Sequence, residues 1–193
     1  MHRLIEQVKA YAALDEHEIG LLEGAVEKRV YDKNEVIFTA GKVSQEIYFV
    51  TQGCVRLFYN VDGMEKTAFF YTEGKFICAG ESYTFGIPAV ENYQALEQTE
   101  IYAFTKSKIE VLLEKAPKFE VIARIATENE LITCQKLIAS FVTKSAEDRY
   151  LDLLNTQGEL FQRVPQQYLA SFLGVSPETL SRIKARVFKK LHS

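Results

Sequence analysis

The stretch from 164 to 187 constrains the fold of this chain more than any other. Leu169 and Leu173 have the spacing of a short amphipathic helix. Gly174 supplies the left-handed residue that ends such a helix, and Ser176 is a good N-cap, with proline at the next position, for a second one. The second helix has an apolar stripe made of Leu180, Ile183 and Val187. Two helices joined by a tight glycine turn predict a helix-turn-helix, although an αα-hairpin in an ordinary helical core has the same local pattern.

The charge of the chain is divided unevenly along its length. The formal net charge is −3, but residues 163–193 hold six basic side chains and one acidic side chain, a net +5. Residues 1–162 hold 17 basic and 25 acidic side chains, a net −8. A basic end on an acidic body indicates a polyanionic partner for that end alone. This distribution favours the helix-turn-helix over the αα-hairpin.

Cysteine spacing and hydropathy exclude several classes of protein. Cys54, Cys78 and Cys134 are far apart and odd in number, which argues against a disulfide framework and against zinc or iron–sulfur sites. We expect them to be small buried hydrophobes, with redox sensing as the alternative. The N-terminus lacks the features of a signal peptide, and no apolar run approaches about 18 residues. A cytoplasmic protein without a cofactor or metal is therefore expected.

Residues from about 30 to 105 change to the two-residue period of β-strands. Short aromatic and β-branched runs occupy 35–38, 46–50, 54–59, 66–71, 93–97 and 100–104. Glycines punctuate the first of them at intervals of 10 to 12 residues, at Gly41, Gly53, Gly63 and Gly74. The dipeptide Asp62-Gly63 predicts a type I′ hairpin turn. Evenly spaced short strands with glycine turns predict a compact antiparallel barrel or double-sheet roll.

Helices are predicted on both sides of these strands. Residues 3–13 are amphipathic, and Asp15 with Glu18 predicts a capping box at the start of a second helix. A short helix is expected from Ser107. A long helix without internal glycine or proline follows over 118–142.

A heptad-like stripe follows this long helix. Its members are separated by 3, 4, 3, 4 and 3 residues, and they are Ile122, Ile125, Asn129, Ile132, Lys136 and Ala139. The stripe favours a dimer interface in which Asn129 sets the register. The alternative is that it packs against the chain's own roll.

The predicted architecture is α+β in three segments. Residues 1–116 form an antiparallel β-roll with flanking helices, and 117–143 form the central dimerisation helix. Residues 144–193 form the helix-turn-helix domain, and the hinge is expected near 143–145.

This order of parts resembles that of the Crp/Fnr superfamily (cyclic-AMP receptor protein / fumarate-nitrate regulator) of bacterial transcription factors. The glycines of 38–41, 47–53 and 71–76 are similar to those at the turns of the family's cyclic-nucleotide-binding roll. Residues 146–151 and 169–182 resemble its hinge-proximal and DNA-reading segments. The resemblance implies a homodimeric regulator, not an enzyme, that binds double-stranded DNA at a palindromic operator. RNA polymerase is implied as a further partner.

The resemblance also assigns roles to side chains of the second helix of the motif. Glu178, Ser181 and Arg182 fall where the family's base-reading residues lie. Their chemistry agrees, because arginine can donate two hydrogen bonds to guanine and glutamate can accept one from cytosine. For Glu178 the alternative is that it complements the helix dipole and pairs with Arg182. The candidates for phosphate contacts, which position the protein on DNA without reading bases, are Arg163, Ser176, Thr179, Lys184, Arg186 and Lys189.

The sequence departs from the family at the nucleotide pocket. Gly80 and Glu81 are candidates for the family's Gly-Glu pair, but no arginine or lysine occurs from Phe76 to Thr105 to hold a cyclic phosphate. Cyclic AMP is therefore not expected to be the effector, and an unknown small molecule remains open. The candidate effector pocket consists of Gly80, Glu81, Ser82, Tyr83 and Gln94, or these side chains line an empty roll.

A second class of function is compatible with a β-roll, namely a cupin-like enzyme or small-molecule-binding roll with a helical appendage. A cupin metal site needs a histidine-rich ligand set on the strands. No histidine occurs between His17 and His192. The sequence therefore favours the regulator.

Overall fold

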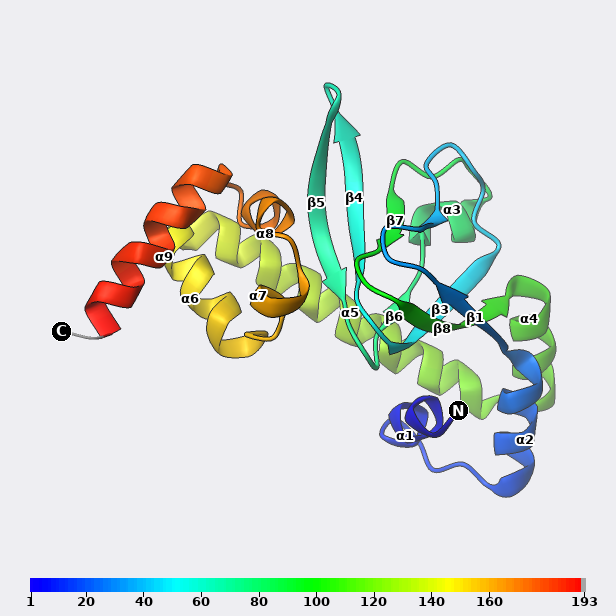
Figure 1. Ribbon diagram of the computed structural model, residues 1–193. Helices are drawn as coiled ribbons and strands as arrows, with labels where there is room; N and C mark the ends of the chain where they lie inside the picture. Colours follow the sequence, from blue (N-terminus) through cyan, green and yellow to red (C-terminus); the bar gives the residue numbers. More distant parts are fainter. Residues whose placement is uncertain (192–193) are drawn as a thin grey trace. The chain divides into compact units, whose positions relative to one another are not determined.

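The structure is a computed structural model that describes residues 1–191 (Figure 1). The last two residues of the predicted C-terminal domain, 192 and 193, lie outside this range. The elements in chain order are α1 (His2–Lys9), α2 (Glu16–Ala25), β1 (Glu27–Tyr31), β2 (Val36–Phe38), β3 (Glu46–Gln52), β4 (Val55–Val61), β5 (Met64–Tyr71), β6 (Phe76–Ile77), α3 (Gly80–Phe85), β7 (Asn92–Ala95), β8 (Thr99–Thr105), α4 (Lys106–Lys115), α5 (Lys118–Thr143), α6 (Ala146–Thr156), α7 (Leu160–Arg163), α8 (Gln166–Phe172) and α9 (Pro177–Leu191).

The strands form two four-stranded sheets. The order is β1–β8–β3–β6 in the first, here called sheet A, and β2–β7–β4–β5 in the second, called sheet B. In sheet A the antiparallel pair β3 and β8 runs from Glu46 opposite Thr105 to Gln52 opposite Glu100. The predicted double-sheet roll is therefore confirmed.

Left-handed backbone occurs at the turns where the sequence places glycine. Asp62 and Gly63 both have positive φ, 51° and 76°, as a type I′ turn between β4 and β5 requires. Gly41, Gly53 and Gly74 also have positive φ. The hairpin turn and the glycine positions predicted from the sequence are confirmed.

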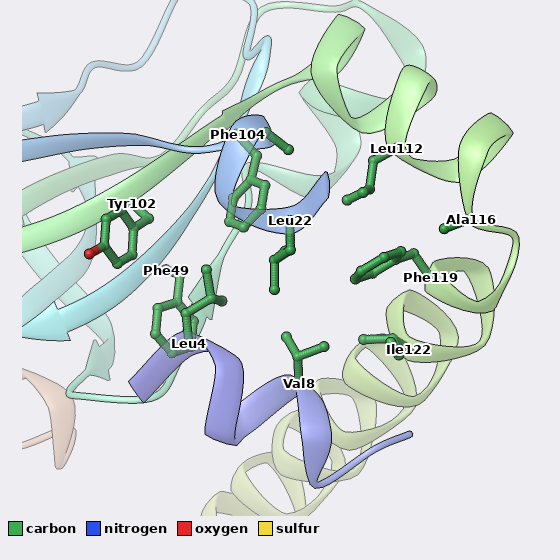
Figure 2. Close-up of a cluster of buried hydrophobic side chains, with 11 residues drawn as sticks. Leu4, Val8, Leu22, Phe49, Tyr102, Phe104, Leu112, Ala116, Phe119 and Ile122 are labelled. Carbon is green, nitrogen blue, oxygen red and sulfur yellow. The ribbon is translucent and has the colours of Figure 1, made fainter. Parts of the chain in front are cut away.

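A hydrophobic core lies between sheet A and the helices α1, α2, α4 and the start of α5 (Figure 2). Leu4 of α1 and Leu22 of α2 are buried against Phe49 of β3. Figure 2 shows Phe119, from the first turn of α5, pointing into the same cluster. The capping box of α2 is confirmed, because Asp15 and Glu18 exchange hydrogen bonds of 2.8 and 2.9 Å between side chain and backbone. Helices at the two ends of the roll segment thus share one core with the sheet.

The C-terminal helices have the predicted apolar stripes and turn. The buried side chains of α8 and α9 are Leu169, Ala170, Leu180, Ile183 and Val187, with Leu173 just after α8. Gly174 has φ of +70°, and the N–H of Val175 donates to the carbonyl of Ala170 at 3.0 Å. Ala170 has no exposed surface, as expected where two helices cross closely. The glycine turn between two amphipathic helices is therefore confirmed.

Four elements were missed by the strand and helix patterns, and one of them, α7, has only four residues. β1 reads Glu-Lys-Arg-Val-Tyr and becomes a strand because it pairs with β8 along five residues. β6 has only two residues, and α3 lacks an apolar period. The first helix also ends at Lys9 rather than at 13.

The chain divides into two compact units that differ from the three predicted segments. One unit contains 1–57 and 70–131, and the other contains 58–69 and 132–193. Helix α5 contributes to both units. The tip of the β4–β5 hairpin belongs with the C-terminal helices, because the backbone N–H of Thr67 donates to Ser171 Oγ of α8 at 2.9 Å. These residues are 104 positions apart, so local sequence patterns do not reveal the contact.

We predict that Gly53→Ala destabilises the protein more than Gly41→Ala. Both glycines have positive φ, but a Cβ at 53 would lie 2.4 Å from Thr99 Oγ1 and 2.7 Å from Thr99 Cα, whereas one at 41 would meet nothing within 4 Å. The expected losses of unfolding free energy are about 1–2 kcal/mol at Gly41, from left-handed strain, and about 2–5 kcal/mol at Gly53, where overpacking adds to it. Urea unfolding of both variants measures this, and equal losses would contradict the prediction.

Candidate functional site

The exposed side of α9 carries the predicted base-reading residues. Glu178, Ser181 and Arg182 are all exposed, on the side of the helix opposite the buried Leu180 and Ile183. This exposed set of three is called the recognition face below. Their spacing of i, i+3 and i+4 places them next to one another on the helix. The structure therefore brings these three candidates together on one surface.

Hydrogen bonds order the recognition face. Gln166 of α8 donates from Nε2 to Ser181 Oγ at 2.7 Å and to the carbonyl of Pro177 at 3.2 Å. Arg182 donates from Nη2 to Thr179 Oγ1 at 3.0 Å. The hydroxyl of Ser176 lowers the pKa of the Glu178 carboxyl, which keeps that side chain a hydrogen-bond acceptor at neutral pH. The face thus presents a guanidinium, a hydroxyl and a carboxylate.

Two of the predicted phosphate ligands cap α9. Ser176 Oγ accepts the N–H of Thr179 at 3.2 Å and donates to Thr179 Oγ1 at the same distance. This is the N-cap arrangement predicted from the sequence. The two hydroxyls lie at the start of the helix, beside the recognition face.

The basic candidates have different surroundings. Arg186 forms an ion pair with Glu147 of α6, as does Lys190 at 2.7 Å, and these contacts lower the pKa of Glu147. Lys184 Nζ lies 5.6 Å from the centre of the Phe161 ring. Arg163 ends α7 and is half-buried, and Lys189 is exposed on the last turns of α9. Arg186 is therefore partly neutralised within the chain, which weakens its candidacy for phosphate.

Arg149, in the hinge-proximal segment, braces the turn before α9. Its Nε and Nη2 donate to the carbonyl of Leu173 at 3.3 and 2.9 Å, and its Nη1 donates to the carbonyl of Lys144 at 2.8 Å. The guanidinium also lies 4.5 Å from the centre of the Phe141 ring. One side chain thus joins the end of α5, the start of α6 and the end of α8. Sequence reasoning assigned it no role.

Two tyrosines are buried on sheet B of the roll, and one of them reaches the residue that follows β6 of sheet A. Tyr93 of β7 in sheet B is 1% exposed, and its hydroxyl donates to the carbonyl of Cys78 at 3.1 Å, directly after β6 of sheet A. Its ring contacts Phe38 and Tyr71, with centroid distances of 6.1 and 6.3 Å. Tyr71, at the end of β5, is 6% exposed. These two residues, called the tyrosine pair below, were not among the predicted pocket residues.

Helix α5 supplies a carboxylate to the tyrosine pair. The hydroxyl of Tyr71 donates to Glu130 Oε1 in a long hydrogen bond of 3.4 Å. Glu130 is half-buried, and desolvation raises the pKa of its carboxyl despite the nearby charge of Lys75 and the bond from Tyr71. The roll and α5 are thus joined by a polar contact that sits largely out of water.

Four of the five predicted pocket residues lie on helix α3, and the fifth, Gln94, lies on β7. Gly80 and Glu81 are exposed in the first turn of α3. Ser82 is buried, and its Oγ accepts the N–H of Ser44 at 2.8 Å. Lys106 Nζ lies over the ring of Tyr83, 5.2 Å from its centre, and donates to its carbonyl at 3.2 Å. Four of the five residues therefore belong to a short helix with separate partners.

Gln94, the fifth, faces away from the tyrosine pair. It is adjacent to Tyr93 on β7, and successive side chains of a strand point to opposite faces. Its Oε1 accepts a hydrogen bond from Arg56 Nε at 2.8 Å, and its Nε2 donates to the carbonyl of Asn34 at 2.8 Å. Arg56 is 1% exposed, so a guanidinium from β4 lies buried in a domain whose 76–105 segment has no cation. The single charged residue in the apolar run 54–58 was the sequence signal for it.

The exposed apolar residues of α5 include Ile132 of the predicted seam, at 46%, but most of them lie outside the seam. Ile122 is 5% exposed and packs in the same core as Phe119. The seam assignment is therefore wrong at Ile122. This residue packs against the chain's own core, which was the alternative. Of the other predicted members, Ile125 is half-buried and the rest are exposed, namely Asn129, Ile132, Lys136 and Ala139.

A second set of exposed apolar side chains lies one residue earlier in the heptad frame, where it alternates with Arg124, Glu128 and Gln135. Val121, Leu131, Ile138 and Val142 are 43, 57, 64 and 78% exposed. Their separations of 10, 7 and 4 residues place them on one face of the helix. We call this set the apolar stripe of α5.

The cysteines are mostly shielded. Cys54 is fully buried, and burial raises the pKa of the Cys78 thiol to about 12, so that thiol is protonated at neutral pH. Cys134 is partly exposed. Within residues 1–191, no three histidine, cysteine or acidic side chains are grouped so that they could hold a metal ion. Over the same residues, the helices are too short or too polar to cross a bilayer.

Comparison with known proteins identifies the roll and the fold. Residues 28–116 match the family model of the cyclic nucleotide-binding domain. No curated protein sequence matches the chain. Among solved structures, the c-di-GMP responsive global regulator CLP of Xanthomonas campestris has a TM-score of 0.71 and 20% identity, over 91% of this chain and 93% of that one.

Two further structures are similar over most of their length. A CooA mutant from Carboxydothermus hydrogenoformans has a TM-score of 0.70 and 20% identity, over 97% of this chain and 84% of that one. The catabolite activator protein of Thermus thermophilus has a TM-score of 0.56 and 22% identity, over 95% and 87%. The similarity therefore extends from the roll through α5 to the C-terminal helices.

We predict that Glu130→Gln changes the pH dependence of stability. Because the folded state raises the pKa of Glu130 above the ordinary value of 4.5, folding favours its protonated form. Its stabilising contribution is present below about pH 4.5 and is lost as pH rises through the folded pKa. Glutamine keeps an acceptor for Tyr71 without a charge. The stability of the variant relative to the wild type should therefore increase from pH 4.5 to 7.5.

Urea unfolding at several pH values measures this difference. Glu128→Gln, which replaces an exposed glutamate of the same helix, is the matched control. If the free energy of unfolding of Glu130→Gln changes with pH in the same way as that of the wild type across this range, the prediction is contradicted.

Proposed function

We propose that this chain, which carries a cyclic nucleotide-binding domain within the fold of the Crp/Fnr regulators, is a homodimeric transcription regulator that binds DNA sequence-specifically. The observation that carries the proposal is the recognition face of α9. It presents polar and charged groups on one side of a helix whose other side is held in an apolar core. Such a helix, preceded by a second helix and a glycine turn, is suited to enter the major groove.

The chemistry of the recognition face supports base reading. Arg182 can donate two hydrogen bonds to O6 and N7 of guanine, and the Glu178 carboxylate can accept one from N4 of cytosine. Ser181 can donate to or accept from either kind of base edge. The three side chains are exposed and lie at adjacent positions, so one groove can receive them together.

Phosphate contacts would come from the basic surroundings of this face. The 163–193 segment carries a net charge of +5. Lys184, Lys189 and Arg163 are proposed as phosphate ligands, and the hydroxyls at the start of α9 as additional donors. Arg186 would have to leave Glu147 to take part. Because these contacts neutralise phosphates, the affinity for DNA should depend strongly on the salt concentration.

The apolar stripe of α5 supports a dimer. Four large apolar side chains exposed along one helix face are expected to be covered by a second copy, because a two-fold pair of helices buries the same stripe on each partner. A two-fold dimer matches a palindromic operator with half-site centres about 34 Å apart. We propose the bacterial cytoplasm as its location and RNA polymerase as its further protein partner.

Arg182→Ala and Lys189→Ala should impair DNA binding in different ways. Loss of a bidentate arginine contact should cost about 1–3 kcal/mol and relax the preference at one base pair in each half-site. Loss of a phosphate contact at Lys189 should lower the affinity for all DNA sequences alike. It should also reduce the slope of log affinity against log salt concentration by about one unit per contact. Selection of binding sites from a random DNA library, repeated at two salt concentrations, distinguishes the two.

An unchanged base preference for Arg182→Ala would mean that α9 docks on DNA in another orientation. Absence of any selected sequence with the wild-type chain would overturn the proposed function itself.

Ile138→Glu should convert the dimer into a monomer at micromolar concentration. The substitution places a charge in the centre of the apolar stripe on both copies, where it would be desolvated without a partner. Val111→Glu is the matched control, because Val111 is also an exposed apolar residue, at 47%, but lies on α4. Sedimentation velocity measures the oligomeric state of both variants. A wild-type monomer that still binds DNA tightly would contradict the dimer.

A further inference from the structure

We propose that the tyrosine pair occupies the position of a small-molecule effector in the roll, so that DNA binding by this regulator needs no effector. In this arrangement the contact between Tyr71 and Glu130 joins the roll to α5 without a ligand. The inference rests on the proposed function and deepens it, because it specifies how the roll acts. It is supported by the side chains between the sheets, by the charged groups near them and by the hydrogen bonds of strand β5.

The space between the sheets is taken by the chain itself. Tyr93 reaches from sheet B to the carbonyl of Cys78, two residues before Gly80, where the ligand-binding segment was predicted to begin. Its ring contacts Tyr71 on one strand and Phe38 on another. Buried aromatic side chains of this size each remove about 150–250 Å² from water. A ligand would have to expel at least one of these rings and expose that area.

The carboxylate beside the tyrosine pair, which has Lys75 as a nearby cation, also disfavours a nucleotide in contact with these rings. Glu130 brings a carboxylate to the hydroxyl of Tyr71, and a carboxylate repels the phosphate of a cyclic nucleotide. The buried guanidinium of Arg56 is bonded to Gln94, which lies on the face of β7 opposite to Tyr93. The cation of β4 is therefore directed to a different face of sheet B from the tyrosine pair.

Connectivity gives the tyrosine pair a route to the DNA-binding helices. An effector acts by binding one conformation better than another, and an internal contact made in only one conformation has the same effect. Strand β5 makes two hydrogen bonds to helices outside the sheets. Tyr71 binds Glu130 of α5, and Thr67, four residues earlier, donates its N–H to Ser171 of α8. The strand that ends in the filled roll is thus also bonded to the helix that packs under the recognition face.

The first test compares two tyrosine hydroxyls. Tyr71→Phe keeps the ring and removes the bond to Glu130. Tyr48→Phe is the matched control, because the hydroxyl of Tyr48 also donates to a carboxylate, Glu46, at 3.0 Å, but within sheet A. Using a DNA duplex selected by the wild-type chain, Tyr71→Phe should lower the affinity at least about 5-fold, the lower end of typical coupling between sites. Tyr48→Phe should leave it unchanged, and equal effects of the two variants would overturn the coupling.

The second test addresses the filled roll directly by thermal unfolding. Cyclic AMP, cyclic GMP and cyclic di-GMP at millimolar concentration should not raise the Tm of the wild-type chain. Tyr93→Ala should open an apolar cavity that p-cresol, the side chain of tyrosine, can enter. p-Cresol should therefore raise the Tm of Tyr93→Ala but not that of the wild type, and should restore part of any lost DNA affinity.

A rise in Tm or in DNA affinity of the wild type with any of the three nucleotides would overturn the inference. So would p-cresol raising the Tm of the wild-type chain as much as that of Tyr93→Ala. If the wild-type chain binds no DNA at all, the proposed function fails. The thermal unfolding results still decide whether the roll is filled, so the two failures are distinguishable.

Discussion

Helix α5 packs against the core of the roll unit with one side, while apolar side chains on its other side remain exposed. Phe119 and Ile122 bury its first turns among the helices and strands of the core. Leu131 and Ile138 lie on the opposite side and are more than half exposed. A 26-residue helix with this division cannot be fully buried by its own chain. The need to cover the second side is the physical reason to expect a symmetrical partner.

The C-terminal unit shows how a small core can fix the position of an exposed polar helix face. Leu180 and Ile183 hold one side of α9, and the glycine turn fixes the angle at which it leaves α8. Arg149 donates hydrogen bonds to the carbonyls just after the ends of α5 and α8, and its guanidinium lies over an aromatic ring. These contacts restrict the conformations open to the turn. The polar groups of the recognition face are therefore carried by a rigid support, which base reading requires.

The roll combines a familiar domain with an unusual interior. Its sheets and turn glycines follow the cyclic nucleotide-binding domain, and residues 28–116 match that family. Tyr71 and Tyr93 are buried in the roll, and its buried guanidinium, Arg56, donates a hydrogen bond to Gln94. A domain can keep its fold while its ligand position is filled, because the fold depends on the alternation of buried side chains and not on the ligand. The proposed loss of effector dependence follows from side chains, not from a change of architecture.

Local features were determined by the sequence alone. The capping box at Asp15, the type I′ turn at Gly63 and the glycine that ends α8 depend on interactions within a few residues, and a few residues are enough to specify them. The tertiary structure decided which faces are buried. Whether Ile122 or its neighbour Val121 is buried, and whether Gln94 or Tyr93 points inward, depends on partners far away in the chain. A heptad or an alternating strand pattern leaves such choices open, because a shift of one residue moves each side chain to another face.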